Sequence, residues 1–382
     1  MDIKEYKCPN CSGAVKFDSS VQRLKCPSCD TEFDIEALDE YQKDLAARKN
    51  FQGAGDGDTI KTEGGGLVKI VASGFTQSNA GETLSESDLG DLATGACPSC
   101  GAQLVGDKNT IAMVCPCCGN SQIVKQRVAG LLKPEHVLPF QLEKKAATEA
   151  LKKFYQGKKL LPNFFKEENR VNSIQGLYVP FWLFDAGAKG RVDYSATKTT
   201  SWSDSDYNYT RTDYYSVVRE GGIGFRKIPV DGSTKMNDDY MDAIEPFDYS
   251  KIKDFHAGYL SGYIAEKYDV DAAASKERAA HRIQNSLESH FARTVRGYSS
   301  VRKEHSNIVV EDSKASYALL PVWVLNSKYQ KQDYQFIMNG QSGLIVGRLP
   351  IDKGKARKYR LLYTALFGGV FTLAIQLLRI FL

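Results

Sequence analysis

The pattern of apolar and polar positions predicts helices and strands in alternation through the middle of the chain. Residues 139–158 carry apolar side chains with the period of an amphipathic helix, and residues 272–296 predict a second, longer helix. Continuous apolar runs at 176–184 and 317–325 predict buried strands. We therefore expect residues 131–350 to form one α+β domain, a mixed antiparallel sheet with helices.

Two segments alternate apolar and polar residues and predict a long antiparallel pair. Residues 191–202 and 208–220 flank the polar turn "SDSD", which we expect to be a solvated hairpin tip. The buried runs before and after this pair contain Pro180 with Trp182 and Pro321 with Trp323, which indicates a faint internal duplication. We expect both tryptophans in the core rather than stacked on a ligand.

The segment before this domain is much poorer in large apolar residues. Residues 34–93 predict a helix with one apolar face near its start and then a linker rich in glycine, serine and acidic residues. As a flexible coil of about 40 residues this linker would span on the order of 35 Å.

The C-terminal pattern predicts a transmembrane helix over residues 361–382. Its first eighteen residues are uncharged, and the whole segment would extend about 33 Å as a helix, enough for a hydrocarbon core of about 30 Å. A buried C-terminal helix of a soluble domain is the alternative. The positive-inside rule places the body in the cytoplasm, because a basic segment, residues 351–360, directly precedes the span.

That basic segment supplies five cations. We expect them to set the topology of a single-pass cell-membrane protein and to attract anionic lipid of the bilayer. The candidate membrane-surface residues are Lys353, Lys355, Arg357, Lys358 and Arg360.

Four C-x-x-C pairs form a cysteine frame that occurs twice. In each copy fourteen residues separate one pair from the next, which suits a short hairpin returning the chain to a metal ion. The frames define two zinc ribbons, at residues 1–33 and 94–125. The predicted ligands are Cys8, Cys11, Cys26 and Cys29 in the first ribbon, and Cys97, Cys100, Cys115 and Cys118 in the second.

Four thiolates favour zinc, because Zn²⁺ accepts a closed tetrahedron of sulfur ligands and then has a structural role. Two structural Zn²⁺ ions are thus expected. Iron in a rubredoxin-like site and a catalytic redox pair are the alternatives. The ninth cysteine, Cys117, aligns with Ser28 of the first frame and is expected to be a bystander thiol.

Composition and charge exclude some functions. A net charge of +4 gives no general argument for nucleic-acid binding, and the first residues lack the apolar run of a signal peptide. No catalytic constellation or phosphate-binding loop is present in the sequence, so we expect no enzyme. The five histidines have no metal-protease spacing; they are His136, His256, His281, His290 and His305.

The paired cysteine frames, the segment "PFQLEKKAATEALKKFYQGKKLLPNFF" and the runs "GLYVPFWLFDA" and "LLPVWVLNSKY" resemble the bacterial TFIIB-type zinc-ribbon proteins of the YdjG-like group. The resemblance covers most of the chain. It implies a membrane-associated protein linked to SPFH-domain and phage-shock-type envelope-stress systems, with the eight ribbon cysteines as metal ligands.

Together these patterns predict a membrane-anchored cytosolic zinc-ribbon adaptor that binds proteins of an envelope-stress assembly. The alternative is a zinc-ribbon protein, also tethered to the membrane, that binds nucleic acid in replication or transcription. Affinity for DNA that falls steeply with salt would favour the alternative.

Overall fold

The structure, a computed structural model, describes about four fifths of the chain and divides it into two compact units. One unit comprises residues 1–74, 188–223 and 284–311, and the other comprises residues 75–187, 224–283 and 312–382. The described residues are 16–18, 23–29, 31–33, 58–61, 67–70, 76–78, 83–84, 92–107, 114–120, 124–126, 132–260 and 262–381.

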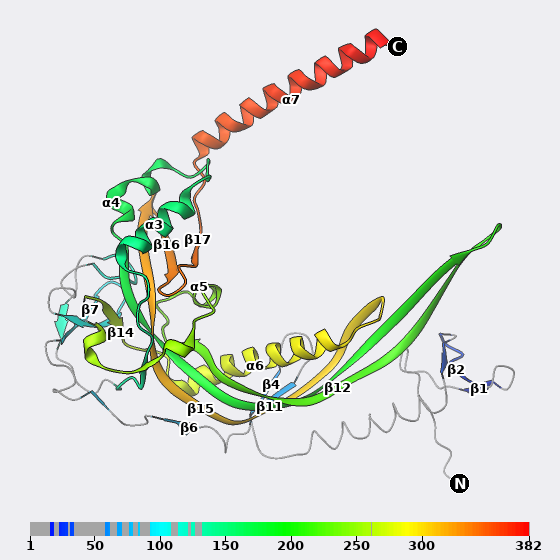
Figure 1. Ribbon diagram of the computed structural model, residues 1–382, viewed down its shortest axis with the longest axis horizontal. Helices are drawn as coiled ribbons and strands as arrows, with labels where there is room; N and C mark the ends of the chain where they lie inside the picture. The colour runs from blue at the N-terminus through cyan, green and yellow to red at the C-terminus, as the bar shows by residue number, and fades with distance from the viewer. Residues whose placement is uncertain are drawn as a thin grey trace. The chain divides into compact units, whose positions relative to one another are not determined.

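A mixed sheet of 14 strands dominates the described residues. Its central path has the order β13-β10-β15-β11-β14-β8-β7-β9. Figure 1 shows the long strands β11, β12 and β15. β10 is parallel to β15 and β11 is parallel to β14, whereas β14 and β8 are antiparallel. Along the path the strands are β13 Lys253–Asp254, β10 His136–Val137, β15 Ser300–Tyr329, β11 Gln175–Ser203, β14 Ile264–Glu266, β8 Gln103–Asp107, β7 Leu92–Ala96 and β9 Val124–Gln126.

The remaining strands of the sheet branch from this path. β12 pairs with β11, β16 pairs with β15 and β17, and β5 pairs with β4 and β15, while β6 also pairs with β15. Their bounds are β12 Asn208–Asp231, β16 Gln332–Asn339, β17 Ile345–Gly347, β4 Asp58–Lys61, β5 Leu67–Ile70 and β6 Thr76–Gln77. A separate small sheet contains β1 Lys16–Asp18, β2 Arg23–Lys25 and β3 Glu32–Phe33.

Helices are few in the described chain. The two predicted amphipathic helices are confirmed as α3 and α6, and the helix expected near residue 35 lies outside the described residues. The α-helices are α3 Lys144–Tyr155, α4 Glu168–Val171, α5 Asp238–Ala243, α6 Ala272–Thr294 and α7 Lys353–Phe381, and the 3₁₀ turns are η2 Asn163–Lys166, η3 Tyr249–Lys251 and η4 Ala257–Leu260.

The predicted α+β class is therefore wrong, because one large sheet replaces the expected balance of sheet and helix. Segments predicted as separate strands and loops are joined: residues 176–184 and 191–202 are parts of the single strand β11. β15 likewise runs without a break through residues that had no strand signal before 317. Pairing with neighbouring strands keeps these polar and glycine-containing stretches extended.

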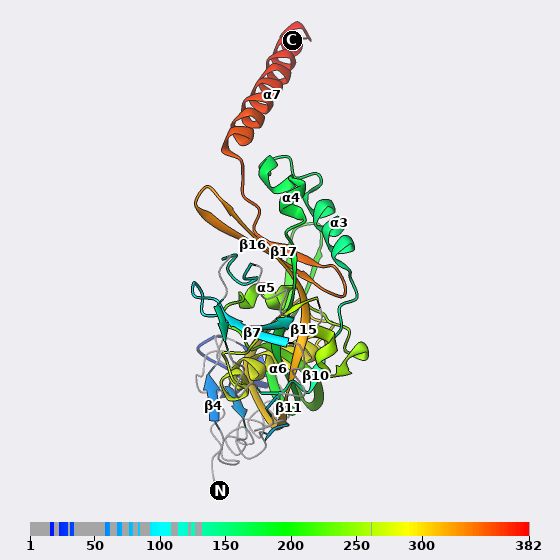
Figure 2. The same cartoon turned by 90° about the vertical axis from the view of Figure 1, so that its left-hand side faces the viewer.

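Both tryptophans of the apolar runs are buried, as predicted. Trp182 donates its indole N–H to the carbonyl of Val270 at 2.8 Å, and Trp323 donates to the carbonyl of Leu142 at 3.1 Å. Trp323 belongs to a buried apolar cluster with residues of α3, α4, β15 and β16. Figure 2 labels these four elements.

The suspected duplication has a counterpart in hydrogen bonding. Gly232, just after β12, donates its N–H to the carbonyl of Pro180 at 2.8 Å. Gly340, just after β16, donates to the carbonyl of Pro321 at 2.9 Å. Pro180 lies in β11 and Pro321 lies in β15. In both the β11–β12 and the β15–β16 pair, the glycine that follows the second strand therefore donates its N–H to the proline carbonyl of the first strand.

The predicted transmembrane helix is not supported. In the part of the chain that the structure describes, no helix is both long and apolar enough to cross a bilayer. The predictions of a cell-membrane localisation and of a C-terminal membrane anchor are therefore wrong.

The five cations expected at a membrane surface lie in the first turns of α7. Asp352 caps this helix by accepting from the N–H groups of Gly354 at 2.9 Å and Lys355 at 3.0 Å. Lys355 donates to the carbonyl of Leu161 at 2.8 Å and to the side chain of Asn163 at 2.7 Å. Lys355 thus connects α7 to the start of η2.

Candidate metal centre

The second cysteine frame is built from two turns with the same backbone geometry. In the first turn, Cys97 donates its N–H to the carbonyl of Ala102 at 2.9 Å, and Gly101 donates to the carbonyl of Cys97 at 2.8 Å. In the second, Cys115 donates to Asn120 at 2.7 Å and Gly119 donates to Cys115 at 2.8 Å. The repeated spacing thus produces a repeated turn.

Each turn ends in a glycine with left-handed backbone geometry, with φ of +75° at Gly101 and +78° at Gly119. A residue with a Cβ atom adopts this conformation at a cost, so glycine is the suitable residue after the second cysteine of each pair. β7 leads into the first turn and β8 leaves it, and β9 follows the second.

The turns bring four sulfur atoms together. The Sγ atoms of Cys97 and Cys118 are 3.6 Å apart, and those of Cys100 and Cys115 are 3.8 Å apart. All four sulfurs lie within 4.8 Å of one another. Sulfurs at about 2.3 Å from a tetrahedral zinc ion are about 3.8 Å apart, so the donor set fits one metal ion.

The electrostatics of the cluster also favour a cation. A hydrogen bond from the Cys117 thiol is the largest influence that lowers the pKa of Cys115, to about 5, and backbone N–H groups of residues 117 and 118 add to it. Burial raises the pKa of Cys100 and of Cys118. The thiolate of Cys115 is thus favoured at neutral pH, and a cation would be needed to hold Cys100 and Cys118 in the thiolate form.

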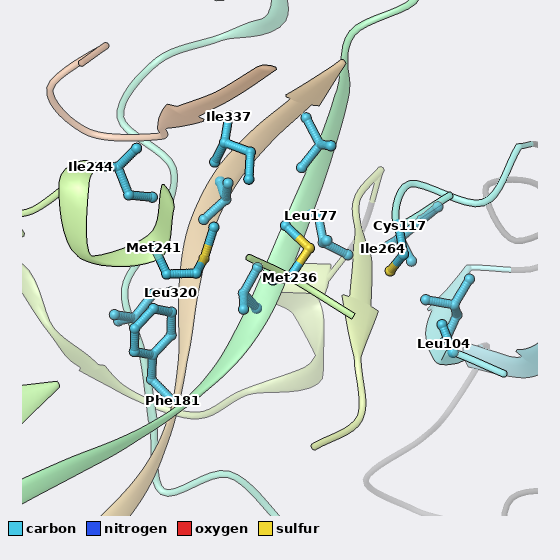
Figure 3. Close-up of a cluster of buried hydrophobic side chains, with 14 of the residues drawn as sticks. Leu104, Cys117, Leu177, Phe181, Met236, Met241, Ile244, Ile264, Leu320 and Ile337 are labelled. Atoms are coloured by element: carbon cyan, nitrogen blue, oxygen red, sulfur yellow. The ribbon is translucent and has the colours of Figure 1, made fainter. Parts of the chain in front are cut away.

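The centre is joined to the main core. Cys97, Cys115 and Cys117 belong to the same buried cluster as Leu177 and Ile264. Figure 3 shows Cys117, Leu177 and Ile264 in this cluster. β8 pairs with β14, so the strands that position the cysteines are part of the large sheet.

Side chains distant in sequence hold the second turn from the other side. Asn326 of β15 donates to the carbonyl of Pro116 at 2.5 Å, and Gln335 of β16 donates to the carbonyl of Cys117 at 3.2 Å. No sequence motif marks these two amides, because their roles depend on tertiary pairing. Cys117, predicted as a bystander, is a buried neighbour of the ligand Cys115.

The first frame is described only in part. Cys26 donates its N–H to the carbonyl of Thr31 at 2.9 Å, as Cys97 does to Ala102. The predicted hairpin is confirmed by the pairing of Phe17 with Leu24. Cys8 and Cys11 lie outside the described residues, so the first predicted site stays a prediction.

Comparison with known proteins finds one relationship over nearly the full length. The chain is 33% identical over 378 residues to the protein named "Uncharacterized protein YdjG" of Bacillus subtilis (strain 168), covering 99% of this chain and 98% of that protein. No family model matches, and no solved structure matches. The relative's name carries no TFIIB-type designation and no link to SPFH or phage-shock systems.

Proposed function

The chain belongs to the family of Bacillus subtilis YdjG, and from this membership and the four-thiolate centre we propose that it is a zinc-containing adaptor that binds other proteins without catalysis. The proposal has two parts, the identity and role of the metal and the surface that takes the partner.

Zinc is the proposed metal. Four thiolates leave no open coordination position, and Zn²⁺ accepts this arrangement without a preference for another geometry. The ion would bind β7, β8 and β9 to one another at the end of the sheet path, so that its role is structural. Iron fits the same donors and is an outcome of the test below.

The observation that carries the adaptor role is a cluster of exposed aromatic side chains at the turn between β11 and β12. This aromatic tip consists of Trp202, Tyr207 and Tyr209, which are 51%, 69% and 40% exposed. Trp202 and Tyr209 stack with ring centroids 5.5 Å apart and an angle of 12° between the rings. Tryptophan and tyrosine are enriched at the centres of protein interfaces, where large rigid rings bury area at small entropic cost.

The construction of the tip supports this role. Asp204 accepts from the N–H groups of Asp206 at 2.9 Å and Tyr207 at 2.8 Å, which fixes the turn. Behind it, hydroxyl pairs link the two strands, Ser201 with Thr210 at 3.2 Å and Thr199 with Thr212 at 3.3 Å. A preordered tip loses little conformational freedom on binding.

We propose proteins as the partners, and the SPFH-type and phage-shock-type systems implied by the family resemblance are the first to test. Nucleic acid remains the alternative partner, since aromatic side chains also stack on bases. Acidic residues Asp204 and Asp206 beside the aromatic tip disfavour a phosphate backbone.

The metal is tested by elemental analysis of the full chain and of two cysteine variants. Cys115→Ser removes a ligand and should lose the metal of the second centre, whereas Cys117→Ser should retain it. Zinc in the parent and equal losses in both variants would contradict the ligand set. Iron in the parent would replace zinc in the proposal.

The partner is tested with a photo-crosslinking amino acid at Trp202 in the cells that express the protein. A matched control places the same amino acid at Lys328, an exposed position on β15. Protease-sensitive, nuclease-resistant adducts at position 202 alone are expected. Nuclease-sensitive adducts would support the nucleic-acid alternative, and equal adducts at both positions would oppose a specific surface.

A further inference from the structure

The outer edge of β12 has no partner strand in the part of the chain that the structure describes. β12 pairs with β11 and with no other described strand, and Figure 1 shows the two strands side by side up to their turn. Nine consecutive residues of β12, 208–216, lie at the surface, and none of them is buried. Such a strand edge can pair with a strand of another chain through its backbone N–H and C=O groups.

The register of the β11–β12 pair shows which backbone groups face this edge. The N–H of Asp204 donates to the carbonyl of Tyr207 at 3.0 Å, so these residues form a hydrogen-bonded pair. Thr199 lies opposite Thr212, where the two hydroxyls are 3.3 Å apart, and its N–H points away from β12 to the side chain of Ser299 at 2.9 Å. The two kinds of pair alternate along an antiparallel ladder, so the N–H and C=O groups of Thr212 point away from β11.

The edge lacks the residues that usually protect an exposed strand. Natural edge strands often carry lysine or proline, which discourage further pairing. Residues 208–218, "NYTRTDYYSVV", contain no proline, glycine or lysine, and threonine, tyrosine and valine favour an extended backbone. The only charged residues in this stretch are Arg211 and Asp213, which have opposite signs. The stretch is therefore suited to the addition of a strand.

The sequence of the edge is complementary to itself in the antiparallel direction. When two copies pair about a two-fold axis at Thr212, Arg211 of each copy lies opposite Asp213 of the other copy. In the same register Tyr209 of each copy lies opposite Tyr215 of the other. Opposite charges and aromatic pairs stabilise neighbouring antiparallel strands, whereas like charges directly opposite each other destabilise them. An axis at Arg211 or at Asp213 would place like charges opposite each other, so the charges favour the axis at Thr212.

The direction of the backbone groups fits the same register. Because the N–H and C=O groups of Thr212 point outward, the two copies of this residue can form a hydrogen-bonded pair across the axis. Thr210 and Tyr214 are two positions away on either side, so their backbone groups also point outward and can bond to each other between the copies. Arg211 and Asp213 then occupy non-hydrogen-bonded pairs, in which opposite side chains lie closer together.

The side chains that this pairing needs are accessible and already ordered. Arg211 and Asp213 have 68% and 34% of their side chains exposed, and they pair with each other within the strand at 2.9 Å. Tyr215 is 41% exposed and contacts the ring of Tyr298, with 5.2 Å between the ring centroids. Two copies would join their ion pairs into a network of four charges, which stabilises more than an isolated exposed pair.

From this edge we infer that the chain forms a symmetric dimer in which β12 of one copy pairs antiparallel with β12 of a second copy, about an axis at Thr212. The two β11–β12 ribbons then form one four-stranded sheet, which is more stable than a two-stranded ribbon in water. Each β12 edge is used once, so the assembly closes as a dimer. The inference goes beyond the adaptor role and does not depend on it.

The oligomeric state of the full chain is tested by analytical ultracentrifugation over a range of concentrations. We expect a dimer that dissociates on dilution. Arg211→Asp and Asp213→Arg each place like charges opposite each other twice in a dimer, so each should raise the dimer dissociation constant about tenfold or more. Lys159→Asp makes the same charge change as Arg211→Asp at an exposed position after α3 and should stay within about threefold of the parent.

Two combinations restore the complementary charges and separate a lost interface from a lost fold. The double variant Arg211→Asp with Asp213→Arg exchanges the two charges within each copy and should dimerise within about threefold of the parent. A mixture of the two single variants should form mixed dimers in preference to like pairs, because one copy is acidic at both positions and the other is basic. A parent that stays monomeric, or a dimer that neither single variant weakens, would overturn the inference.

The register is tested with a photo-crosslinking amino acid at Tyr209 of the purified protein. We expect covalent dimers whose adduct maps by mass spectrometry to the segment around Tyr215 of the other copy. The same amino acid at Lys159 is the matched control and should give no covalent dimer. Adducts that map to another segment would contradict the axis at Thr212. The purified protein contains no other partner, so this result is independent of the crosslinks at Trp202 that test the adaptor role.

Discussion

Trp182 and Trp202 lie on the same strand, β11, and have opposite environments. Trp182 is 1% exposed, donates to Val270 and contacts the rings of Tyr268 and Tyr317. Trp202 is 51% exposed and stacks only across the β11–β12 pair, on Tyr209 among the described rings. The difference teaches that assigning a residue to β11 does not predict whether its side chain is buried. One end of this strand lies in the core and the other end lies at the surface.

The sequence around each tryptophan explains the contrast. Residues 177–184 of β11 are buried without interruption, which is typical of a strand covered on both faces. Residues 198–203 are exposed and mostly polar, and hydroxyl pairs with β12 replace apolar packing there. The four variants below test this contrast, from the largest expected effect to the smallest.

Trp182→Ala should have the largest effect, a loss of about 3–5 kcal/mol in the free energy of unfolding. The substitution removes an aromatic side chain that is fully enclosed and leaves the carbonyl of Val270 without its donor. Denaturant unfolding measures the change. A loss below about 1 kcal/mol would mean that this end of β11 is not core.

Arg278→Met should lower the free energy of unfolding by about 3 kcal/mol at pH 7, because it leaves the buried carboxylate of Asp231 in β12 without its cation. Arg278 donates to Asp231 at 2.5 Å and to Asp242 at 2.6 Å, and the side chain of Asp231 is 1% exposed. Burial raises the pKa of Asp231 to about 6 even with the arginine present.

The sign of the pH dependence follows from this raised pKa. The protonated form of Asp231 is favoured in the folded state, so its stabilising contribution is present below about pH 4 and is lost as the pH rises through 6. The loss caused by Arg278→Met should therefore be smaller at pH 5 than at pH 7. The double variant Asp231→Asn with Arg278→Met is the control and should show little of this pH dependence.

Lys303→Met should lower the free energy of unfolding by about 1 kcal/mol at pH 7. Lys303 of β15 donates to Glu288 of α6 at 2.6 Å, and Gln284 donates to the same carboxylate at 2.8 Å. Burial tends to raise the pKa of Glu288, but these hydrogen bonds outweigh it and lower the pKa. The carboxylate contributes stability above about pH 4.3 that is lost in more acidic solution, so the effect of Lys303→Met should shrink near pH 3.

Trp202→Ala should change the free energy of unfolding by less than about 0.5 kcal/mol, because the ring is exposed. The same variant should lose the proposed partner, which a direct binding assay can measure. A large loss of stability would instead make the tip part of the fold, and the contrast with Trp182 would disappear.

Local patterns predicted local features of the molecule well. The helical spacing of residues 139–158 and 272–296 corresponds to α3 and α6, and the C-x-x-C spacing corresponds to two matching turns. These features depend on residues close in sequence, where periodicity and turn chemistry act directly.

Long-range pairing explains what the sequence did not predict. The stretch "DAGAKG" (residues 185–190) is typical of a loop, yet β11 passes through it because neighbouring strands pair along it. Glu266 has no motif, and its place beside the metal centre depends on the pairing of β14 with β8. The apolar C-terminal pattern predicted a span, whereas no helix of the described residues is both long and apolar enough to cross a bilayer.

The position of β15 at the centre of the sheet has a consequence for the order of folding. Ser78, at the end of β6, bonds to Ala315 of β15 across 237 residues of sequence. At about 5–20 residues per second, a ribosome needs roughly 12–50 s to synthesise the residues between them. During that time β5 and β6 exist without the strand that they pair with. The N-terminal strands therefore join the sheet only late in synthesis, and high contact order makes this step slow.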